Sequence, residues 1–342
     1  YGAGLARLNG RAMSRPIGIL LLQLGTPDAP TPAALRRYLR QFLSDPRVID
    51  LPRALWWPLL HGIVLRTRPR RSARDYAKVW TSAGSPLGVT SAQQARLLQE
   101  RLTGRGIHAL VRVVMRFGEP STAQALTELA SAGVERIIAL PMYPQYASAT
   151  TGSSVAELFR VAGKGRVVPA IRTLPPYFSD AAYIAALAAV TRGQLGDWAP
   201  EHIVLSFHGI PERYVRNGDP YADHCRATTR ALTEALAWDP ECVTMSFQSR
   251  FGPEAWLRPY TTDTLRQLGE ARMAGVAVLC PGFMADCLET LEEIGVRERR
   301  TFEGAGGRDF RLVSCLNAES PWIDALEVMV LREAQGWLPD TL

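Results

Sequence analysis

The sequence lacks the features that define several large classes of protein. No stretch approaches the roughly 18 to 20 consecutive apolar residues of a membrane-spanning helix. The N-terminal part has no continuous apolar segment of the secretory type. The patterns G-x-G-x-x-G, G-x-x-x-x-G-K-[ST], H-E-x-x-H and G-x-S-x-G are all missing. Proposals of NAD binding, ATP binding or hydrolysis therefore lose their main support.

Cysteine and net charge are also scarce. The five cysteines are odd in number and none forms a C-x-x-C pair, which argues against a disulfide framework and a closed zinc knuckle. The balance of 39 Lys and Arg against 33 Asp and Glu gives a charge of +6, too weak over 342 residues to imply a nucleic-acid partner. We expect a folded cytoplasmic protein in a reducing compartment.

The order of apolar segments predicts an α/β fold. Short Val, Ile and Leu runs that end at Gly or Pro alternate with longer Ala-rich segments of helical period, as in parallel sheets joined by helices. The length favours two domains with separate cores. We predict two similar doubly wound, Rossmann-like domains, each with a central parallel sheet. The expected strands cover residues 17–23, 109–117, 134–140, 202–207, 243–247 and 276–280.

The two halves of the chain repeat one another. Residues 19–28 and 203–212 are both apolar strands that run into a Gly-x-Pro-acid turn, and Met115-Arg-Phe117 matches Met245-Ser-Phe247. Between matching positions the first half is 44 residues longer, and we place this insertion near 42–86. A duplicated unit explains both observations.

The domain boundaries follow from this repeat. The first domain is expected over 16–173 and the second over 174–318, with Pro175-Pro176 interrupting the pattern near the boundary. Residues 319–342 are expected to form a C-terminal helical segment. Residues 1–12, which are polar and precede Met13, are taken as an extension outside the folded domains.

The insertion contains an apolar and aromatic run, Leu55–Leu65, followed by five arginines within residues 66–74. Trp and Leu beside an arginine cluster are typical of peripheral attachment to an anionic membrane surface. The alternative is a helix packed on the core with a solvated basic tail. Either arrangement is compatible with a lip over a hydrophobic ligand.

Residues just after the predicted strands are the first candidates for chemistry, because open α/β sheets bind ligands at that edge. His208 follows one strand and can accept a proton or bind a metal, or serve as a hydrogen-bonded structural residue. Arg116 can pair with a substrate carboxylate or with a neighbouring acid. Trp256 can line an aromatic pocket or pack in the core.

Three acids follow the predicted strand 276–280. Helical spacing places Asp286, Glu289 and Glu293 on or near one face. Such a stripe can hold or conduct a divalent cation. The alternative is that the acids are favoured by the helix dipole and face water.

Several motifs in order resemble the ferrochelatase family, lyases that insert ferrous iron into protoporphyrin IX to form protoheme, the terminal step of heme biosynthesis. The resemblance extends from Pro16 to about Trp322. The motifs that carry it are Leu24–Pro27, Tyr143–Tyr146 with Thr151–Ser154, Ser206–Pro211, Asn217–Tyr221, Phe247–Gly252 and Cys280–Glu293.

The resemblance implies a porphyrin held in a cleft between the domains. It assigns His208 and Glu289 as catalytic and metal-binding residues, with His208 acting as base or as iron ligand. Glu293 and Asp286 would relay metal. Some relatives have His where Cys287 stands, so this position does not supply an imidazole here. The residues expected to bind substrate are Arg116, Leu24, Trp256, Ser85 and Tyr146.

Some relatives carry a [2Fe-2S] cluster held largely by C-terminal cysteines. No cysteine follows Cys315 here, and Ala-Ser-Ala follows Tyr146, so we expect the bacterial type without a cluster. No permanently bound cofactor is expected, and Fe²⁺ is a substrate. We expect a monomer or homodimer, with peripheral contact to the inner face of the membrane through Leu55–Leu65.

The sequence leaves two other functions open. The first is a chelatase for another tetrapyrrole or metal, such as coproporphyrin or cobalt, although the Trp56-Trp57 pair favours the more hydrophobic protoporphyrin. The second is a binding protein without catalysis, either a tetrapyrrole carrier or a two-lobed protein of the periplasmic kind.

Overall fold

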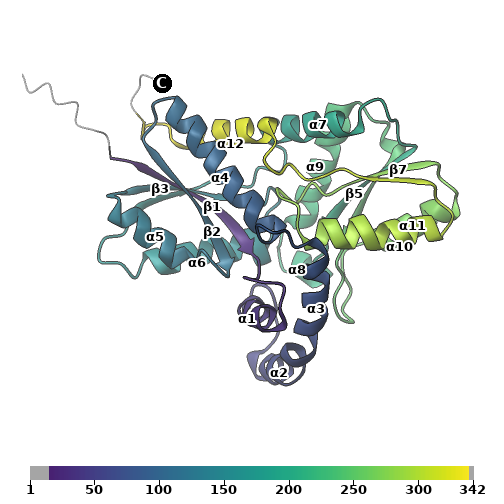
Figure 1. Cartoon of the computed structure of the whole chain (residues 1–342), viewed down its shortest axis with the longest axis horizontal. Helices are drawn as coiled ribbons and strands as arrows, with labels where there is room; N and C mark the ends of the chain where they lie inside the picture. Colours follow the sequence, from purple (N-terminus) through teal and green to yellow (C-terminus); the bar gives the residue numbers. More distant parts are fainter. Residues whose placement is uncertain (1–14, 339–342) are drawn as a thin grey trace, which may run out of the picture.

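The computed structural model describes residues 15–338, so the extension expected over residues 1–12 lies outside the described part. Two four-stranded parallel sheets with the same strand order form the centres of two lobes (Figure 1). This confirms the predicted α/β fold with two similar domains. The first sheet has the order β2-β1-β3-β4 and consists of β1 (Ile17–Gly25), β2 (Ala109–Phe117), β3 (Arg136–Pro141) and β4 (Ala170–Thr173). The second has the order β6-β5-β7-β8 and consists of β5 (His202–His208), β6 (Val243–Gln248), β7 (Gly275–Leu279) and β8 (Asp309–Leu312).

All six predicted strands are present, with ends that shift by at most two residues. The two strands missed by the sequence pattern, β4 and β8, have four residues each and lie at sheet edges. Most of their side chains are only half-buried or exposed. They therefore lack the continuous apolar run by which the central strands are recognised.

The helices form three groups along the chain. Those between β1 and β2 are α1 (Pro32–Leu43), α2 (Arg53–Leu59), the π-helical η1 (Leu60–Val64), α3 (Leu65–Val79) and α4 (Pro86–Gly104). Those that complete the first half are α5 (Thr122–Ser131), the π-helical η2 (Ser148–Gly152) and α6 (Ser153–Ala162). Those of the second half are α7 (Ala181–Leu195), α8 (Glu212–Arg216), α9 (Tyr221–Leu236), η3 (Pro240–Cys242), α10 (Thr261–Glu270), the π-helical η4 (Glu289–Glu298), α11 (Arg299–Gly304) and α12 (Ser320–Glu333).

We expected each domain to have a separate core. This is wrong for one face of each sheet, where the two lobes share a core. Strand side chains alternate between two faces. In the first sheet, Ile19 and Leu21 join the same buried cluster as Leu205 and Phe207 of the second sheet. The intervening residues belong to a smaller core on the outer face of each lobe. The lobes therefore share one inner core and keep individual outer cores.

The C-terminal helix strengthens this connection. In Figure 1, α12 and α7 lie along the same side of the molecule and span the two lobes, and α12 also packs on α4. Trp322 of α12 and Tyr183 of α7 are fully buried in the shared core. Arg172 of β4 donates to the carbonyl oxygens of Glu333 and Gln335, which ties the end of α12 to the edge of the first sheet.

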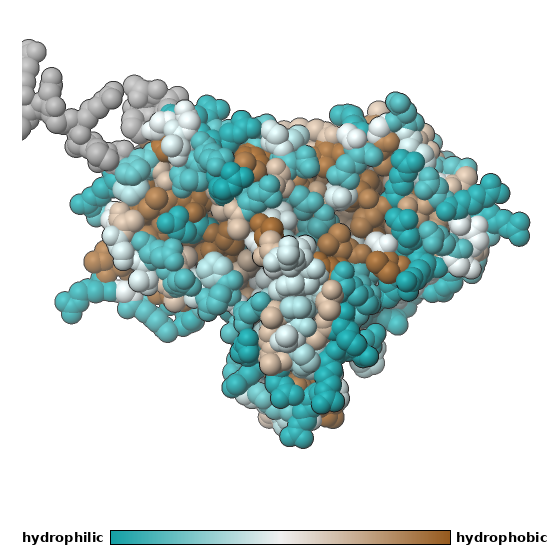
Figure 2. All heavy atoms as spheres, viewed as in Figure 1, coloured by the Kyte–Doolittle hydropathy of each residue, from teal (hydrophilic) through white to brown (hydrophobic). Residues whose placement is uncertain are grey.

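The segment from α1 to α3 projects from the molecule between the two lobes (Figure 1), and we call it the lip. It has a core of its own around Trp56, whose Nε1 donates to the Leu43 carbonyl at 2.7 Å. Four large apolar side chains of α2 and η1 stay exposed. These are Leu55, Trp57, Leu59 and Ile63. The surface of the projection is otherwise largely hydrophilic in the view of Figure 2. Within residues 15–338, no helix has the length and apolar character to cross a membrane.

Candidate active site

His208 is the last residue of β5, at the carboxyl edge of the second sheet. Its ring is half-buried, and Nδ1 lies 2.7 Å from the carbonyl oxygen of Gly209. A carbonyl oxygen only accepts hydrogen bonds, so this contact assigns the proton to Nδ1 in the neutral ring. Nε2 then carries the free lone pair. The local backbone thus prepares one ring nitrogen to accept a proton or to bind a metal.

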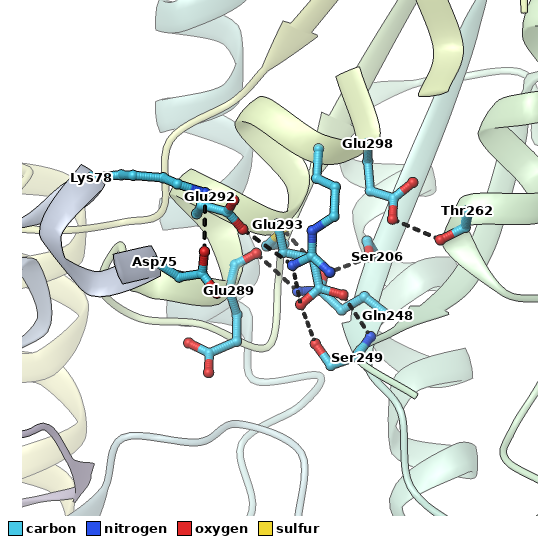
Figure 3. A network of polar contacts seen from close by, with 12 residues as sticks. Asp75, Lys78, Ser206, Gln248, Ser249, Thr262, Glu289, Glu292, Glu293 and Glu298 are labelled. Atoms are coloured by element: carbon cyan, nitrogen blue, oxygen red, sulfur yellow. Dashed lines mark hydrogen bonds and ion pairs between the residues drawn. The ribbon is translucent and has the colours of Figure 1, made fainter. Parts of the chain in front are cut away.

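Glu289 is the first residue of η4, a π-helix. π-helices are rare and often found at functional sites. Their i→i+5 hydrogen bonds widen each turn, so side chains four to five residues apart lie above one another. Glu289, Glu293 and Glu298 are consequently stacked along one side of η4. In Figure 3 the carboxylate of Glu289 turns away from the polar network formed by the other acids.

Gln248, at the end of β6, joins the segments that carry His208 and Glu289. Its backbone carbonyl accepts from the Gly209 amide at 2.8 Å, and its side-chain amide donates to the Glu289 carbonyl at 3.2 Å. Its side-chain oxygen accepts from Ser206 at 2.6 Å. The residue is almost completely buried. Gln248 thus fixes the position of one candidate relative to the other.

The lip packs against η4 through α3. Burial raises the pKa of Tyr38 on α1, and the nearby charge of Glu289 raises it further. Burial lowers the pKa of Arg68 on α3, while Glu289 opposes this change. Burial and then Glu289 raise the pKa of Cys287. These effects of one charge on α1, on α3 and on the residue before η4 are in line with the packing of α3 on η4.

The other acids of η4 are engaged by protein groups (Figure 3). Glu293 accepts from both the backbone amide and the hydroxyl of Ser249, at 2.9 and 2.6 Å. Ser249 adopts a φ of 67°, an unusual backbone conformation for a residue other than glycine. Glu298 accepts from Thr262 at 2.6 Å. Glu289 is therefore the acid of η4 whose carboxylate is turned away from this network.

The placement of Asp286 on the same helical face is wrong, because η4 begins only at Glu289. Asp286 is buried in the preceding turn, where its carboxylate accepts from Asn317 Nδ2 at 2.6 Å and from Thr290 Oγ1 at 2.9 Å. Periodicity alone did not reveal that the helix starts three residues later. The structure does not bring Asp286 together with the other two acids.

Arg116 and Ser85 have structural partners. The Arg116 guanidinium donates to Asp45 at 2.6 Å and to Ser153 at 2.7 Å, so the predicted alternative of a neighbouring acid is the one observed. Ser85 caps α4 by accepting from the Gly88 amide at 3.1 Å. Both residues therefore fix segments that adjoin the lip.

Trp256 lies against the turn that follows His208. It forms an isolated antiparallel bridge with Pro211, and an added Cβ at Gly209 would come within 3.1 Å of its ring. Its Nε1 is buried, and no residue in 15–338 accepts its hydrogen bond. A buried donor without a partner is costly and is uncommon in folded proteins.

Leu24 and Tyr146 lie at the carboxyl edge of the first sheet. The Leu24 amide donates to the Tyr143 hydroxyl at 2.6 Å. The Tyr146 hydroxyl lies 2.8 Å from the position that a Cβ of Gly152 would occupy. Glu289 contributes to the raised pKa of Tyr143, although burial is the main cause.

The sequence patterns missed the residues that surround the main candidates. Gln248 and Ser249 belong to the 247–252 motif but carry no signal by residue type alone. Tyr38 precedes the insertion expected over 42–86, and Arg68 belongs to the arginine cluster for which the sequence indicated only membrane attachment or a solvated tail. Within the described chain, no three His, Cys, Asp or Glu side chains gather into a metal-holding group.

Comparisons with known proteins show the family to which the chain belongs. A family model described as ferrochelatase matches residues 16–334. Ferrochelatases of Methylibium petroleiphilum and Chromobacterium violaceum are 50% and 49% identical over 324 residues, covering 94% of this chain and 89% and 88% of the relatives. The ferrochelatase of Bordetella pertussis is 47% identical over 326 residues, covering 94% of this chain and 89% of the relative.

Among solved structures, SirB from Bacillus subtilis with Fe³⁺ aligns with a TM-score of 0.57 at 13% identity, covering 94% of this chain and 97% of SirB. The sirohydrochlorin chelatase SirB with cobalt aligns at 0.52 and 15% identity, over 74% of this chain and 92% of that chain. At these identities the likeness shows the fold alone. The family match and the close relatives go further: this chain belongs to the ferrochelatase family.

Proposed function

We propose that this chain inserts ferrous iron into protoporphyrin IX to form protoheme, with His208 and Glu289 at the centre of the reaction. The observation that carries the proposal is the arrangement of these two residues around Gln248. One hydrogen bond of Gln248 holds the segment after His208, and another holds the start of η4. The alternative of a different tetrapyrrole or metal, or of a carrier, has less support from the relatives.

Metal insertion requires the loss of two pyrrole protons and a distortion that exposes the nitrogen lone pairs. The neutral His208 ring, with Nδ1 bonded to a carbonyl, offers Nε2 as the acceptor for a pyrrole proton. The same nitrogen would ligate iron in the alternative role. General bases of this kind contribute about 10² to 10⁴ in rate.

Glu289 provides a negative charge on the lip side of the cleft. Its carboxylate is turned out of the polar network, so it can neutralise the incoming Fe²⁺ or accept a proton. Glu293 stands next on the same side of η4 and would relay metal toward it. Asp286 would contribute through the turn that holds the start of η4.

The substrate would be enclosed from both lobes. Trp256 covers the porphyrin on the His208 side, where its buried Nε1 lacks a protein partner within the described residues. Leu24 and Tyr146 contribute from the first sheet. Arg116 and Ser85 act indirectly, by fixing Asp45 and the start of α4 beside the lip.

The exposed apolar side chains of the lip would contact a membrane surface. Leu55 and Ile63 are 73% and 58% exposed, and arginines of α3 accompany them in sequence. We expect wild-type protein to sediment with vesicles of phosphatidylserine and phosphatidylcholine, and the Leu55→Glu/Ile63→Glu variant to stay in solution. Val167→Glu/Val168→Glu, changed at exposed apolar residues elsewhere, is the matched control. Equal sedimentation of both variants would rule out lip-mediated attachment.

The reaction would proceed without an iron–sulfur cluster. Clusters are held mostly by four cysteines, and the described residues contain no group of three or more His, Cys, Asp or Glu side chains that could hold a metal. Acid-labile sulfide in anaerobically purified protein is expected to be absent. One sulfide or more per chain would contradict this part of the proposal.

The proposed activity is tested by anaerobic incubation of the wild-type chain with Fe²⁺ and either protoporphyrin IX or coproporphyrin. Loss of porphyrin fluorescence and the heme absorption spectrum report metalation. We expect many heme equivalents per protein, with protoporphyrin preferred. At most one equivalent would indicate a carrier, and a preference for coproporphyrin would change the substrate.

A further inference from the structure

The chain contains only two lysines, Lys78 and Lys164, among 39 basic residues. Lys164 is exposed after α6, whereas Lys78 lies near the end of α3 and reaches across to η4. The Lys78 ammonium is 2.7 Å from Glu292 Oε1 and 3.0 Å from Asp75 Oδ1 (Figure 3). These bonds raise the pKa of Lys78, so it stays charged at neutral pH. The bond from Lys78 to Glu292 therefore joins the lip to the helix that begins at Glu289.

Glu292 differs from the other acids of η4 in having a cation at each oxygen, whereas Glu293 has only the more distant Arg297 Nη2, at 3.9 Å from its Oε2. Lys78 binds Oε1, and Arg297 Nη2 lies 3.2 Å from Oε2. The Glu292 side chain is only 8% exposed, although both cations remain in contact with water. A buried carboxylate between two cations has little charge left to attract a third.

We propose that Lys78, together with Arg297, keeps Glu292 out of the metal path and so restricts cation handling on η4 to Glu289 and Glu293. This inference rests on the roles proposed for those two acids. Lys78 is a positioning residue, because it acts through Glu292 and touches neither substrate. The lip thus takes part in metal delivery as well as in enclosing the porphyrin.

Removing the Lys78 charge would leave Glu292 with one cation, three residues from Glu289 on the same helix. A partly neutralised carboxylate there attracts a divalent cation and holds it away from the porphyrin. For Lys78→Gln we expect the KM for Fe²⁺ to fall about fivefold and kcat to fall about tenfold. The KM for protoporphyrin stays within about twofold of wild type, since substrate contacts are unchanged.

Matched variants separate this effect from a structural one. Lys78→Arg keeps the charge and is expected to restore both constants. Lys78→Gln/Glu292→Gln removes the competing carboxylate together with its cation and is expected to recover the wild-type KM for Fe²⁺. Lys164→Gln changes the other lysine and is expected to behave as wild type. Arg297→Gln, which removes the second cation, shifts the KM for Fe²⁺ in the same direction as Lys78→Gln and provides a second test if the latter folds poorly.

The inference is overturned if Lys78→Gln and Arg297→Gln both leave the KM for Fe²⁺ unchanged. It is also overturned if Lys78→Gln raises the KM for protoporphyrin and lowers Tm without affecting the KM for Fe²⁺. That result would mean that Lys78 only stabilises the packing of the lip on η4. The site roles proposed for Glu289 and Glu293 are tested separately by Glu289→Gln. Full turnover by this variant would contradict those roles and would remove the premise of the inference as well.

Discussion

The ends of β1 and β5 occupy the same place in two sheets of identical strand order, yet they carry different residues. Leu24 stands one residue before the turn glycine Gly25, and His208 stands one residue before Gly209. The Leu24 amide is bound by Tyr143, whereas the His208 ring presents a free nitrogen. The carboxyl edge of a parallel sheet provides a place for ligands, and the side chain there decides the chemistry.

The segments that follow these strands differ as well. After β1 the chain builds the lip before it reaches α4, whereas after β5 the short α8 alone precedes α9. Tyr214 of α8 donates to the Val48 carbonyl at 3.0 Å and accepts from the Asp50 amide at 3.2 Å, and Arg213 pairs with Asp50. The half with the histidine therefore holds the base of the lip that the other half contributes. Both halves of the chain therefore contribute to the contact between the lip and the second lobe.

Among the acids of η4, we expect the largest loss of activity on substitution of Glu289, whose carboxylate is turned away from the polar network. Glu289→Gln should reduce kcat about 100-fold, because the uncharged amide neither neutralises iron nor accepts a proton. Glu293→Gln should reduce kcat only about tenfold, because Ser249 already binds the Glu293 carboxylate in the wild-type protein. Anaerobic steady-state kinetics with Fe²⁺ measure both. Equal losses would show that the two acids have equivalent roles.

A smaller loss is expected when the connection between His208 and Glu289 is removed. Gln248→Leu keeps the size of the side chain but deletes its bonds to Glu289 and Ser206. We expect kcat to fall about tenfold, with little change in either KM, because the reacting groups lose alignment. Gln267→Leu, at an exposed residue of α10, is the control. An unchanged kcat for Gln248→Leu would contradict the bridging role.

The substrate walls of the two halves allow a further comparison. Trp256→Leu removes an aromatic surface beside His208 and should raise the KM for protoporphyrin several-fold, at roughly unchanged kcat. Tyr146→Phe, on the first sheet, should have a smaller effect, because its ring remains. Porphyrin titration followed by fluorescence gives both affinities. A larger effect at Tyr146 would place the main porphyrin contact on the first lobe.

The smallest effect concerns stability. Burial raises the pKa of Glu298, the hydrogen bond from Thr262 opposes this and Glu293 adds to it. The pKa of Glu298 is therefore higher in the folded protein than in the unfolded chain. At a pH above the folded-state pKa, the ionised carboxylate destabilises the folded protein. This destabilisation disappears once the pH falls below the pKa of the unfolded chain. Glu298→Gln should raise Tm by about 2–4 °C at neutral pH. The gain should vanish in acid, and a gain that is independent of pH would contradict this explanation.

The sequence predicted what repeated local patterns encode and missed what depends on contacts. The central strands and His208 were recognisable because a buried apolar run ends at a Gly-x-Pro turn. The edge strands β4 and β8 are held mainly by a neighbouring strand and have no such run. Arg116 was placed correctly at a strand end, but its partner Asp45 lies 71 residues away in the sequence. The start of η4 at Glu289, which leaves Asp286 outside the helix, has no signature in residue type.

The matching of the repeat was also only approximate. Met115 and Met245 correspond in the sequence pattern, but Met115 lies opposite Gln23, two residues before the turn glycine, and Met245 lies opposite Leu205, four residues before it. The two-residue difference preserves which face each side chain occupies. It therefore left the predicted cores intact while shifting β6 along β5 by two residues relative to β2 along β1.

The most direct test compares His208→Ala with Leu24→Ala, the same change at matching places in the two halves. Turnover of protoporphyrin IX and Fe²⁺ is followed anaerobically by the heme spectrum, with porphyrin binding measured on the same samples. We predict that His208→Ala binds porphyrin but forms no heme catalytically, whereas Leu24→Ala keeps kcat and shows a modestly higher KM for porphyrin. Catalytic turnover by His208→Ala at the wild-type rate would contradict the central role of this histidine.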